Sequence, residues 1–507
     1  MGMFRNRSFK ECMGSYKEPS RELPVVAAPD VLVVGAGPAG IGAAIASARS
    51  GAQTMLVERY GFIGGNLTIA MVNPMFTFHD RKGRQVIRGI AGELVDRLVA
   101  LKWSDGHVAD LTFDNASMTP FDPEGMKILL LRMVRELGCE LLLHTLVTGA
   151  SAQNGSVKAV IIESKSGRQV IRPKYVIDCS ADADVAAQAG CSFVLGRKED
   201  GRMQPVTLFF RIGGVDDVAL RGWMKANRHL LKDAPSDAEI DTHSAVSFLG
   251  MNKMVKEAMA RGEYPQAAAA RILFYQLPQK DQIAVNATRL QGIDGTDVRD
   301  LTRAELETRE QAWGVFSFLK AHVGGFDRAF MLDTGIQVGV RETRHIVGDY
   351  EMVEDDVLAG RSFEDGIACG TFAIDIHPPE GEKQVFTGSG RVVYEIPYRS
   401  LLPKGMGNMW VAGRCLCATH AAFGSARVMA TCMGIGQGAG TAAAYAARYG
   451  VTSREVDTAA IRKQLVADGQ YLLNEGIDDE FDEALRLDRA HGSGAEAAHH
   501  NPFEAIP

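Results

Sequence analysis

The stretch "DVLVVGAGPAGIGAAIASARSGAQTMLVERYGFIGGNLT", residues 30–68, decides the fold of this chain. "DVLVVG" is a short, β-branched apolar run that is typical of a buried parallel strand. "IGAAIASARSG" predicts a small-residue helix that ends at Gly51, and "QTMLVERYG" predicts a second strand that ends in Glu58. This order of strand, glycine turn, helix and strand predicts an α/β fold with a doubly wound sheet.

The glycine turn has the spacing G-x-G-x-x-G, which suits the approach of a phosphate group. The first glycine permits the tight turn, the second lets a pyrophosphate approach the backbone, and the third lets the helix pack on the strand. The first N–H groups of the helix then face the phosphates. Glu58 follows Gly40 by 18 residues, close to the ~20 at which an acid binds the ribose. The predicted nucleotide-binding residues are Gly35, Gly37, Pro38, Ala39, Gly40 and Glu58.

A second pair of glycines follows in "RYGFIGGNLT", residues 59–68, just beyond the second strand. Here the sequence resembles the FAD-dependent oxidoreductases of the glutathione-reductase-like superfamily, in which Glu, Arg or Lys and then G-G-x-x-T follow that strand. The resemblance implies an FAD cofactor, with Glu58 on the adenosine ribose and the next residues running toward the flavin. These residues are Arg59, Gly64, Gly65, Asn66, Leu67 and Thr68.

Two later segments match the same superfamily. "GCELLLHTLVTGASAQNGSVKAVIIES", residues 138–164, resembles the strand and β-hairpin whose backbone contacts the adenine. "KYVIDCSADADVAAQAG", residues 174–190, resembles the strand that ends in A-T-G-D, although Cys-Ser-Ala-Asp stands there in this chain. The resemblance implies cofactor contacts at Val147, Ser180 and Asp182.

The run "MGIGQGAGTAAAYAARYG", residues 433–450, also has the spacing G-x-G-x-x-A. Helix formers surround it on both sides, and no strand with an acid follows, so a second nucleotide site is not predicted. The four glycines from Gly434 to Gly440 each cost roughly 1 kcal/mol inside a helix. We therefore expect Gly434 and Gly438 on one side and Gly436 and Gly440 on a neighbouring one, packed closely against the helix after Gly40.

The surrounding segment, residues 408–444, closely resembles a subgroup that ends in T-H-x-A-x-x-S-x-R-V-M-x-x-C-M-x-x-G-Q-x-A-G. The resemblance implies that a loop at Gly413 and Arg414 reaches the ribityl chain, although relatives carry an acid where Arg414 stands. It also implies a helix that begins near Met429 to Thr431 and points its first N–H groups at the flavin.

The chain of 507 residues is too long for a single core, so we expect several parts. The expected fold is an FAD-binding Rossmann-like domain of three layers with a β-meander, plus an inserted α+β substrate domain. The predicted parts are an N-terminal arm (1–28), the FAD-binding domain (29–200 and 396–475), the inserted domain (201–395) and a C-terminal helix and tail (476–507).

Four side chains are candidates for the chemistry, and alternatives stay open for each. His420 is the first choice for a base because the resemblance places its loop at the flavin; otherwise it binds backbone structurally. Arg427 clamps a substrate carboxylate or the flavin carbonyl, or forms an ion pair. His377 sits on a rigid turn before two prolines, with or without an active-site role. Arg341 and Arg344, spaced i,i+3, share a helical face and bind an acid, or form surface ion pairs.

The leading hypothesis is an FAD-dependent dehydrogenase or oxidase that transfers a hydride from a small organic substrate to flavin N5, with O2 or a carrier as electron acceptor. The alternatives are a thiazole-synthase-like or heterodisulfide-reductase-like flavoprotein, and a non-catalytic binding protein of the GDP-dissociation-inhibitor type. Missing cysteine clusters disfavour the heterodisulfide reductase. The intact Glu58 and the Gly64–Gly65 pair disfavour the non-catalytic protein.

Composition narrows the partners and the compartment. The net charge of −7 argues against nucleic acid or an anionic membrane, and no apolar run is long enough to span a bilayer. Eight cysteines without a C-x-x-C pair indicate reduced thiols and a cytoplasmic protein, and Cys415 and Cys417 are poorly spaced for a disulfide. No metal site is predicted, since His499 and His500 lie in a Gly/Ala-rich tail. A homo-oligomer and covalent FAD attachment at His79 stay open.

Overall fold

Five strands pair in parallel around the stretch at residues 30–68, in the order β23-β11-β2-β3-β7. The computed structural model describes residues 14–112, 115–232, 235–381, 384–388, 392–476, 479, 481–482 and 485. The strands of this sheet are β2 (Val31–Val34), β3 (Thr54–Val57), β7 (Glu140–Leu142), β11 (Tyr175–Asp178) and β23 (Met409–Val411). The predicted unit of strand, turn, helix and strand is confirmed as β2, α1 and β3.

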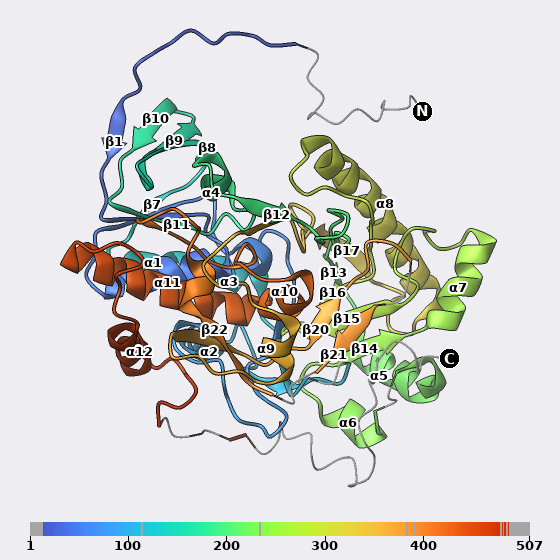
Figure 1. Ribbon diagram of the computed structural model, residues 1–507. Helices are drawn as coiled ribbons and strands as arrows, with labels where there is room; N and C mark the ends of the chain where they lie inside the picture. Colours follow the sequence, from blue (N-terminus) through green and yellow to red (C-terminus); the bar gives the residue numbers. More distant parts are fainter. Residues whose placement is uncertain are drawn as a thin grey trace.

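The sheet is the middle of three layers, as Figure 1 shows. Val31, Val33 and Leu56 point into a core shared with the helices on one face, whereas Leu32 and Val34 point into a core shared with a β-meander on the other. The helices are α1 (Pro38–Arg49), α2 (Ile90–Ala100), α3 (Pro123–Glu136) and α11 (Met429–Tyr449). The opposite layer holds β1 (Val25–Ala27), β8 (Leu146–Gln153), β9 (Ser156–Ser164) and β10 (Gly167–Ile171). The expected α/β architecture with its meander is confirmed.

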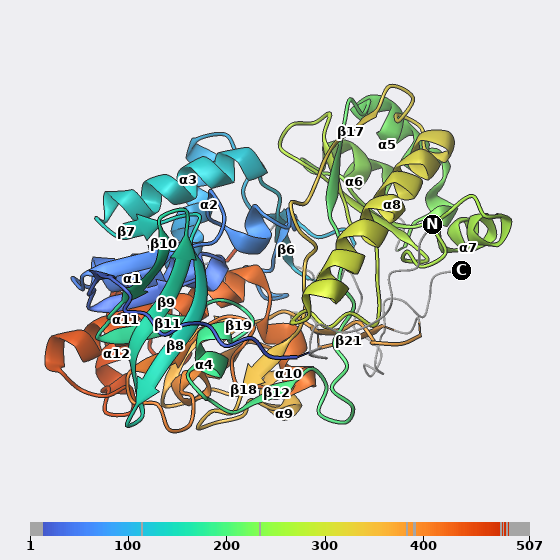
Figure 2. The same cartoon turned by 90° about the horizontal axis from the view of Figure 1, so that it is seen from above.

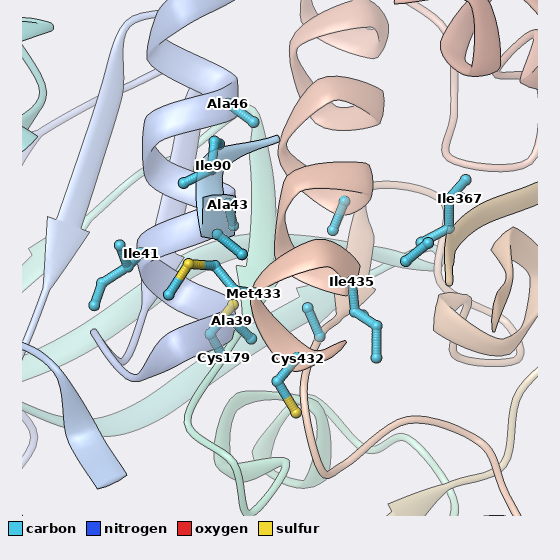
Figure 3. Close-up of a cluster of buried hydrophobic side chains, with 14 of the residues drawn as sticks. Ala39, Ile41, Ala43, Ala46, Ile90, Cys179, Ile367, Cys432, Met433 and Ile435 are labelled. Carbon is cyan, nitrogen blue, oxygen red and sulfur yellow. The ribbon is translucent and has the colours of Figure 1, made fainter. Parts of the chain in front are cut away.

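Helices α1 and α11 come from opposite ends of the chain and lie side by side (Figure 3). A Cβ built on Gly436 would lie 1.9 Å from the Ala39 carbonyl oxygen, and one on Gly440 would lie 2.2 Å from that of Ala43. Gly438 instead faces Ile367, and Gly434 faces Ala368 at an ordinary contact distance. The predicted division of the four glycines between two sides of the helix is therefore confirmed.

A second lobe carries an antiparallel sheet in the order β14-β15-β16-β13-β17, with α8 packed along it (Figure 2). Its own core draws on residues between Val206 and Val338. The strands are β13 (Phe210–Gly213), β14 (Ser247–Gly250), β15 (Ile272–Gln276), β16 (Ile283–Val285) and β17 (Phe330–Thr334). The helices are α5 (Asp217–Ala226), α6 (Asp237–Thr242), α7 (Asn252–Arg261) and α8 (Val298–His322).

Short elements connect the two lobes. Residues from Met352 to Ile396 contribute to the core of the first lobe, so the segment expected as one insert, 201–395, takes part in both cores. The connecting strands are β4 (Met75–Phe76), β5 (Val108–Ala109), β6 (Ser117–Thr119), β12 (Phe193–Leu195), β18 (Arg344–Ile346), β19 (Gly366–Gly370), β20 (Ile374–Ile376), β21 (Val385–Thr387) and β22 (Tyr394–Pro397). The remaining helices are α4 (Asp184–Gln188), α9 (Glu354–Leu358), α10 (His420–Ala426) and α12 (Thr458–Ala467).

The described residues contain neither a membrane-spanning helix nor a metal-ligand cluster. None of the helices there combines the length and the apolar character that a membrane span requires. No group of three or more His, Cys, Asp or Glu side chains lies in an arrangement that could hold a metal ion, again within the described residues. Most of the predicted C-terminal segment, 476–507, lies outside the described part of the chain, as do Cys12, His499 and His500.

Candidate functional site

A cavity of about 810 Å³, here called cavity 1, runs between the first lobe and the residues around the start of α8. It begins at the turn between β2 and α1 and extends to the start of α11. Most residues predicted to bind the cofactor line it. They are Gly35, Gly37, Pro38, Ala39, Glu58, Arg59, Gly65, Asn66, Val147, Ser180, Asp182, Gly413, Arg414 and Met429.

The three glycines of the first turn have different surroundings. Gly35 has φ +91°, and a Cβ there would lie 2.6 Å from the Cys179 carbonyl oxygen. A Cβ on Gly40 would lie 1.8 Å from the Gly35 carbonyl oxygen, so this glycine closes the turn onto the helix. Gly37 has φ −75°, and the nearest atom to its Cβ would be the Gly65 Cα at 4.0 Å. Neither conformation nor packing of the protein itself therefore requires a glycine at Gly37, which leaves space for a ligand against the backbone.

Two helices begin at cavity 1 without side-chain caps. The N-caps of α1 and α11 are Gly37 and Val428, neither makes a side-chain cap hydrogen bond, and neither helix carries an acid in its first turn. Such termini carry unsatisfied N–H groups and a partial positive charge. α11 begins at Met429, as the resemblance implied. The two ends of cavity 1 thus suit a pyrophosphate and the electron-rich edge of a flavin.

The Glu58 carboxylate lies at the other end of the glycine turn and is only 6% exposed. It accepts hydrogen bonds from the backbone N–H groups of Ala36 (2.8 Å) and Tyr60 (3.1 Å). A carboxylate offers about four acceptor positions, so capacity remains for ribose hydroxyls. Together with the space at Gly37 and the two helix termini, this donor and acceptor set fits an FAD molecule.

Arg414 stands where relatives carry an acid, and the structure pairs it with an acid from another strand. One of its amino groups donates to Asp182 Oδ1 at 2.6 Å, and Thr343 Oγ1 donates to the same oxygen at 2.7 Å. Asp182 and Arg414 both line cavity 1. The carboxylate at this part of the cavity therefore follows β11, not β23.

Five predicted cofactor residues do not line cavity 1: Gly40, Gly64, Leu67, Thr68 and Thr431. Thr68 is buried and its hydroxyl donates to the Ile63 carbonyl oxygen at 2.8 Å. Its side chain fills the space beside Gly64, where a Cβ would lie 2.2 Å from Thr68 Oγ1. Gly64 and Thr68 shape the loop beside the cavity, and Leu67 and Thr431 are buried in the packing around it.

The second lobe supplies a wall of cavity 1 that sequence analysis missed. Arg59 Nη2 donates to Gln337 Oε1 at 2.9 Å, and the Tyr60 hydroxyl donates to the same oxygen, so the two lobes meet beside the cavity. No motif marks this wall, because its residues are of ordinary types and lie far in the sequence from the glycine turn. They are Gly295, Thr296, Val298, Leu301, Glu305, Arg309, Ile336, Gln337, Val338 and Val340.

A smaller cavity of about 150 Å³, here called cavity 2, adjoins cavity 1. Asn66, Val340, Arg414, Arg427 and Met429 line both, so the two meet where α11 begins. The lining of cavity 2 combines aromatic with charged residues. The aromatic residues are Phe76, Phe209, Tyr275, Phe372 and Phe386, and the charged or titratable ones are Arg271, Arg341, Arg414, Arg427, Asp375 and His377.

Arg341 lies in cavity 2 without a carboxylate partner among the described residues. Its Nη1 donates to the Pro205 carbonyl oxygen (2.6 Å) and to Thr207 Oγ1 (2.7 Å). Burial and the positive charge of Arg427 together lower the pKa of Arg341 to about 9. The expected shared helical face of Arg341 and Arg344 is wrong, because Arg344 lies in strand β18 and pairs with Asp184 at 2.9 Å.

His377 and Asp375 form a pair in cavity 2. His377 Nε2 lies 3.2 Å from Asp375 Oδ2, and Arg427 Nη2 donates to the Asp375 carbonyl oxygen at 3.1 Å. Burial lowers the pKa of His377 to about 3, and the positive charge of Arg341 contributes in the same direction. The imidazole is therefore neutral, and its Nε2 also lies 3.1 Å from the amide nitrogen of Gln384.

His420 lies at the start of α10 and lines neither cavity. Its Nδ1 lies 2.7 Å from Glu342 Oε1, and His345 Nε2 lies 3.0 Å from the same oxygen. Burial raises the pKa of Glu342, but the hydrogen bonds from His345 and His420 outweigh burial and lower the pKa to about 2. This hydrogen-bonded cluster ties the segment after Arg341 to α10.

Two other expectations concern covalent attachment of FAD at His79 and the state of the cysteines. His79 is buried, its Nδ1 lies 3.0 Å from Ser117 Oγ, and it lines neither cavity. All seven described cysteines are free thiols, including Cys415 and Cys417.

Comparison with known proteins identifies the family. A family model described as FAD dependent oxidoreductase matches residues 30–465. The sarcosine oxidase subunit alpha of Corynebacterium sp. (strain P-1) is 39% identical over 82 residues, which are 16% of this chain and 6% of that protein. The chain thus matches only a small part of that relative's length.

Solved structures are similar across most of the chain. A geranylgeranyl bacteriochlorophyll reductase-like protein from Thermoplasma acidophilum has a TM-score of 0.42 and 13% identity, with 91% of this chain and 95% of that chain covered. The p-nitrophenol 4-monooxygenase from Pseudomonas putida DLL-E4 has a TM-score of 0.40 and 12% identity, with 88% and 84% covered.

Proposed function

This chain belongs to the FAD dependent oxidoreductase family, and from that premise we propose that it oxidises a small organic molecule held in cavity 2. The protein is an enzyme, and its cofactor is FAD. The observation that carries the proposal is the junction of the two cavities at Arg414, Arg427 and Met429. A ligand in cavity 2 lies beside whatever occupies the α11 end of cavity 1.

The residues of cavity 1 would hold the cofactor by its polar groups. Gly37 and the start of α1 would contact the pyrophosphate, and Glu58 would accept hydrogen bonds from the adenosine ribose. The start of α11 would face the flavin. When bound, FAD supplies the acceptor for a hydride from the substrate, and O2 or an electron carrier then takes the electrons away.

His377 is the residue of cavity 2 best placed to take a substrate proton. Asp375 and Gln384 contact Nε2, whereas Nδ1 makes no hydrogen bond to any described residue, so Nδ1 is the ring nitrogen available to a substrate. A substrate that loses a hydride from carbon must also lose a proton from its hydroxyl or amine group, and a neutral imidazole accepts it. His420, the first choice from the sequence, instead contacts Glu342 and is proposed as a positioning residue.

The test is anaerobic reduction of the FAD-loaded enzyme, followed by the loss of flavin absorbance during a screen of small alcohols, amines and hydroxy acids. With a reducing substrate in hand, His377→Gln should slow reduction by roughly 10²–10⁴-fold, as expected for loss of a general base. His420→Gln is the matched control and should slow it much less. The reverse order would return the role of base to His420. If no small organic molecule reduces the flavin, the proposed reaction is wrong.

A further inference from the structure

Cavity 2 concentrates positive charge in a space that is small and partly apolar. Four arginines and one carboxylate, that of Asp375, line it. Arg414 forms an ion pair with Asp182 at 2.6 Å, so it contributes little to the excess positive charge. Asp375 serves both His377 and Arg427, so it balances part of the charge only.

Arg341 is the clearest sign of a missing anion. Only its Nη1 makes hydrogen bonds to described residues, and both partners are neutral oxygens. Arg341 is half-buried, and a guanidinium that is partly removed from water without a counter-ion is unfavourable for a folded protein. Arginine presents its donors as a rigid fork that matches a carboxylate in bidentate geometry. The rest of this fork is therefore available to a ligand.

Arg427 gives a second, partly engaged donor group on the same cavity. Its Nη2 contacts Asp375, whereas its Nε is buried and has no partner among the described residues. The side chain is 14% exposed. Since Arg427 stands two residues before the start of α11, at the junction with cavity 1, an anion here would lie next to the α11 end of that cavity.

The aromatic residues of cavity 2 set the rest of the ligand's chemistry. Phe372 packs against Phe76 at 6.1 Å and against Phe386 at 6.0 Å between ring centroids. Such rings favour an apolar group and offer no charge. The volume of about 150 Å³ is much smaller than that of cavity 1, which favours a small molecule.

We propose that cavity 2 binds a small monocarboxylate, with the carboxylate held by Arg341 and Arg427 and a short apolar group against Phe76, Phe372 and Phe386. This inference rests on the proposed function insofar as it names the substrate class of the same site. Binding itself needs no turnover, so the two are tested separately.

The first experiment titrates the oxidised, FAD-loaded enzyme with butanoate and, at the same ionic strength, with its neutral isostere butanamide. Binding is followed by isothermal calorimetry and by the change in the visible spectrum of the bound flavin. We expect butanoate to bind at least tenfold more tightly than butanamide. Equal affinities, or tighter binding of the amide, would overturn the inference without the use of any variant.

The second experiment assigns the binding to the arginines. Arg341→Met should weaken butanoate about 10- to 100-fold and leave butanamide unchanged, because it removes charge-assisted hydrogen bonds. Arg341→Lys should give an intermediate loss, since charge remains but the fork is gone. Arg261→Met is the control: this arginine is exposed at the end of α7, paired with Glu263, and should have no effect. Wild-type affinity in Arg341→Met, with FAD retained, would contradict the assignment.

The outcomes for substrate class and for reaction are separable. If butanoate binds through Arg341 but no carboxylate, alcohol or amine reduces the flavin, the inference stands and the proposed reaction fails. If a neutral substrate reduces the flavin with the same KM in wild type and Arg341→Met, the proposed reaction stands and the inference fails.

Discussion

Cavity 1 and cavity 2 share a border at Arg414, Arg427 and Met429, yet main-chain atoms form one end of cavity 1 whereas side chains form cavity 2. The main-chain atoms that form this end of cavity 1 belong to the glycine turn and to the uncapped start of α1. Cavity 2 is formed by side chains from strands and loops far apart in the sequence. A backbone-built site needs glycines at fixed spacings, which a sequence displays, whereas a side-chain-built site leaves no local pattern.

The largest expected effect tests the glycine framework. Gly436→Leu should abolish stable folding, because even its Cβ would lie 1.9 Å from the Ala39 carbonyl oxygen and the two helices would have to separate. The measurement is soluble yield and thermal unfolding followed by circular dichroism. A folded Gly436→Leu enzyme with the wild-type melting temperature would contradict the close packing of α1 and α11.

The matched control lies two residues earlier in the same helix. Gly434→Ala adds a Cβ at 3.4 Å from Ala368 Cβ, an ordinary contact. Alanine is preferred over glycine in a helix interior by about 1 kcal/mol. We therefore expect Gly434→Ala to be neutral or slightly stabilising. Strong destabilisation of both variants would mean that the helix tolerates no substitution at all, and would remove the distinction between its two sides.

A smaller effect should separate ligand binding from folding within one turn. Gly37→Ala should leave the melting temperature of the FAD-free protein unchanged but weaken FAD binding at least tenfold, because the added methyl group occupies the space against the backbone. Gly40→Ala should instead destabilise the fold, since its Cβ would lie 1.8 Å from the Gly35 carbonyl oxygen. FAD affinity is measured by fluorescence titration. Unchanged affinity in Gly37→Ala would place the pyrophosphate elsewhere.

The sequence could predict those parts of the protein that local spacing determines. The β2, α1 and β3 unit follows from periodicity and glycine spacing, and the packing of Gly436 and Gly440 on α1 follows from small residues repeated on one helix face. The start of α11 at Met429 came from the resemblance to known flavoproteins.

The rest depended on contacts between distant residues. His420 was predicted to reach the flavin, but its side chain contacts Glu342, 78 residues earlier in the chain, and lines neither cavity. The second-lobe wall of cavity 1 depends on how α8 meets the first lobe, and its amphipathic pattern identifies a helix without identifying its neighbour. Arg271 and Asp375 both line cavity 2 although they are far apart in the sequence.

The last expected effect concerns pH and the hydrogen bonds that Glu342 makes with His345 and His420. Glu342→Gln should lower the free energy of unfolding by up to about 3 kcal/mol at pH 7. Although burial raises the pKa of Glu342, hydrogen bonds from His345 and His420 lower it to about 2. An unfolded glutamate has a pKa near 4.3. The carboxylate's stabilisation is therefore complete above about pH 4.3 and is lost as the pH falls toward 2, with about half gone by pH 3. Urea unfolding of wild type and variant at pH 7 and pH 3 measures this difference. A gap that is the same at both pH values would mean that Glu342 stabilises the fold through packing and not through its charge.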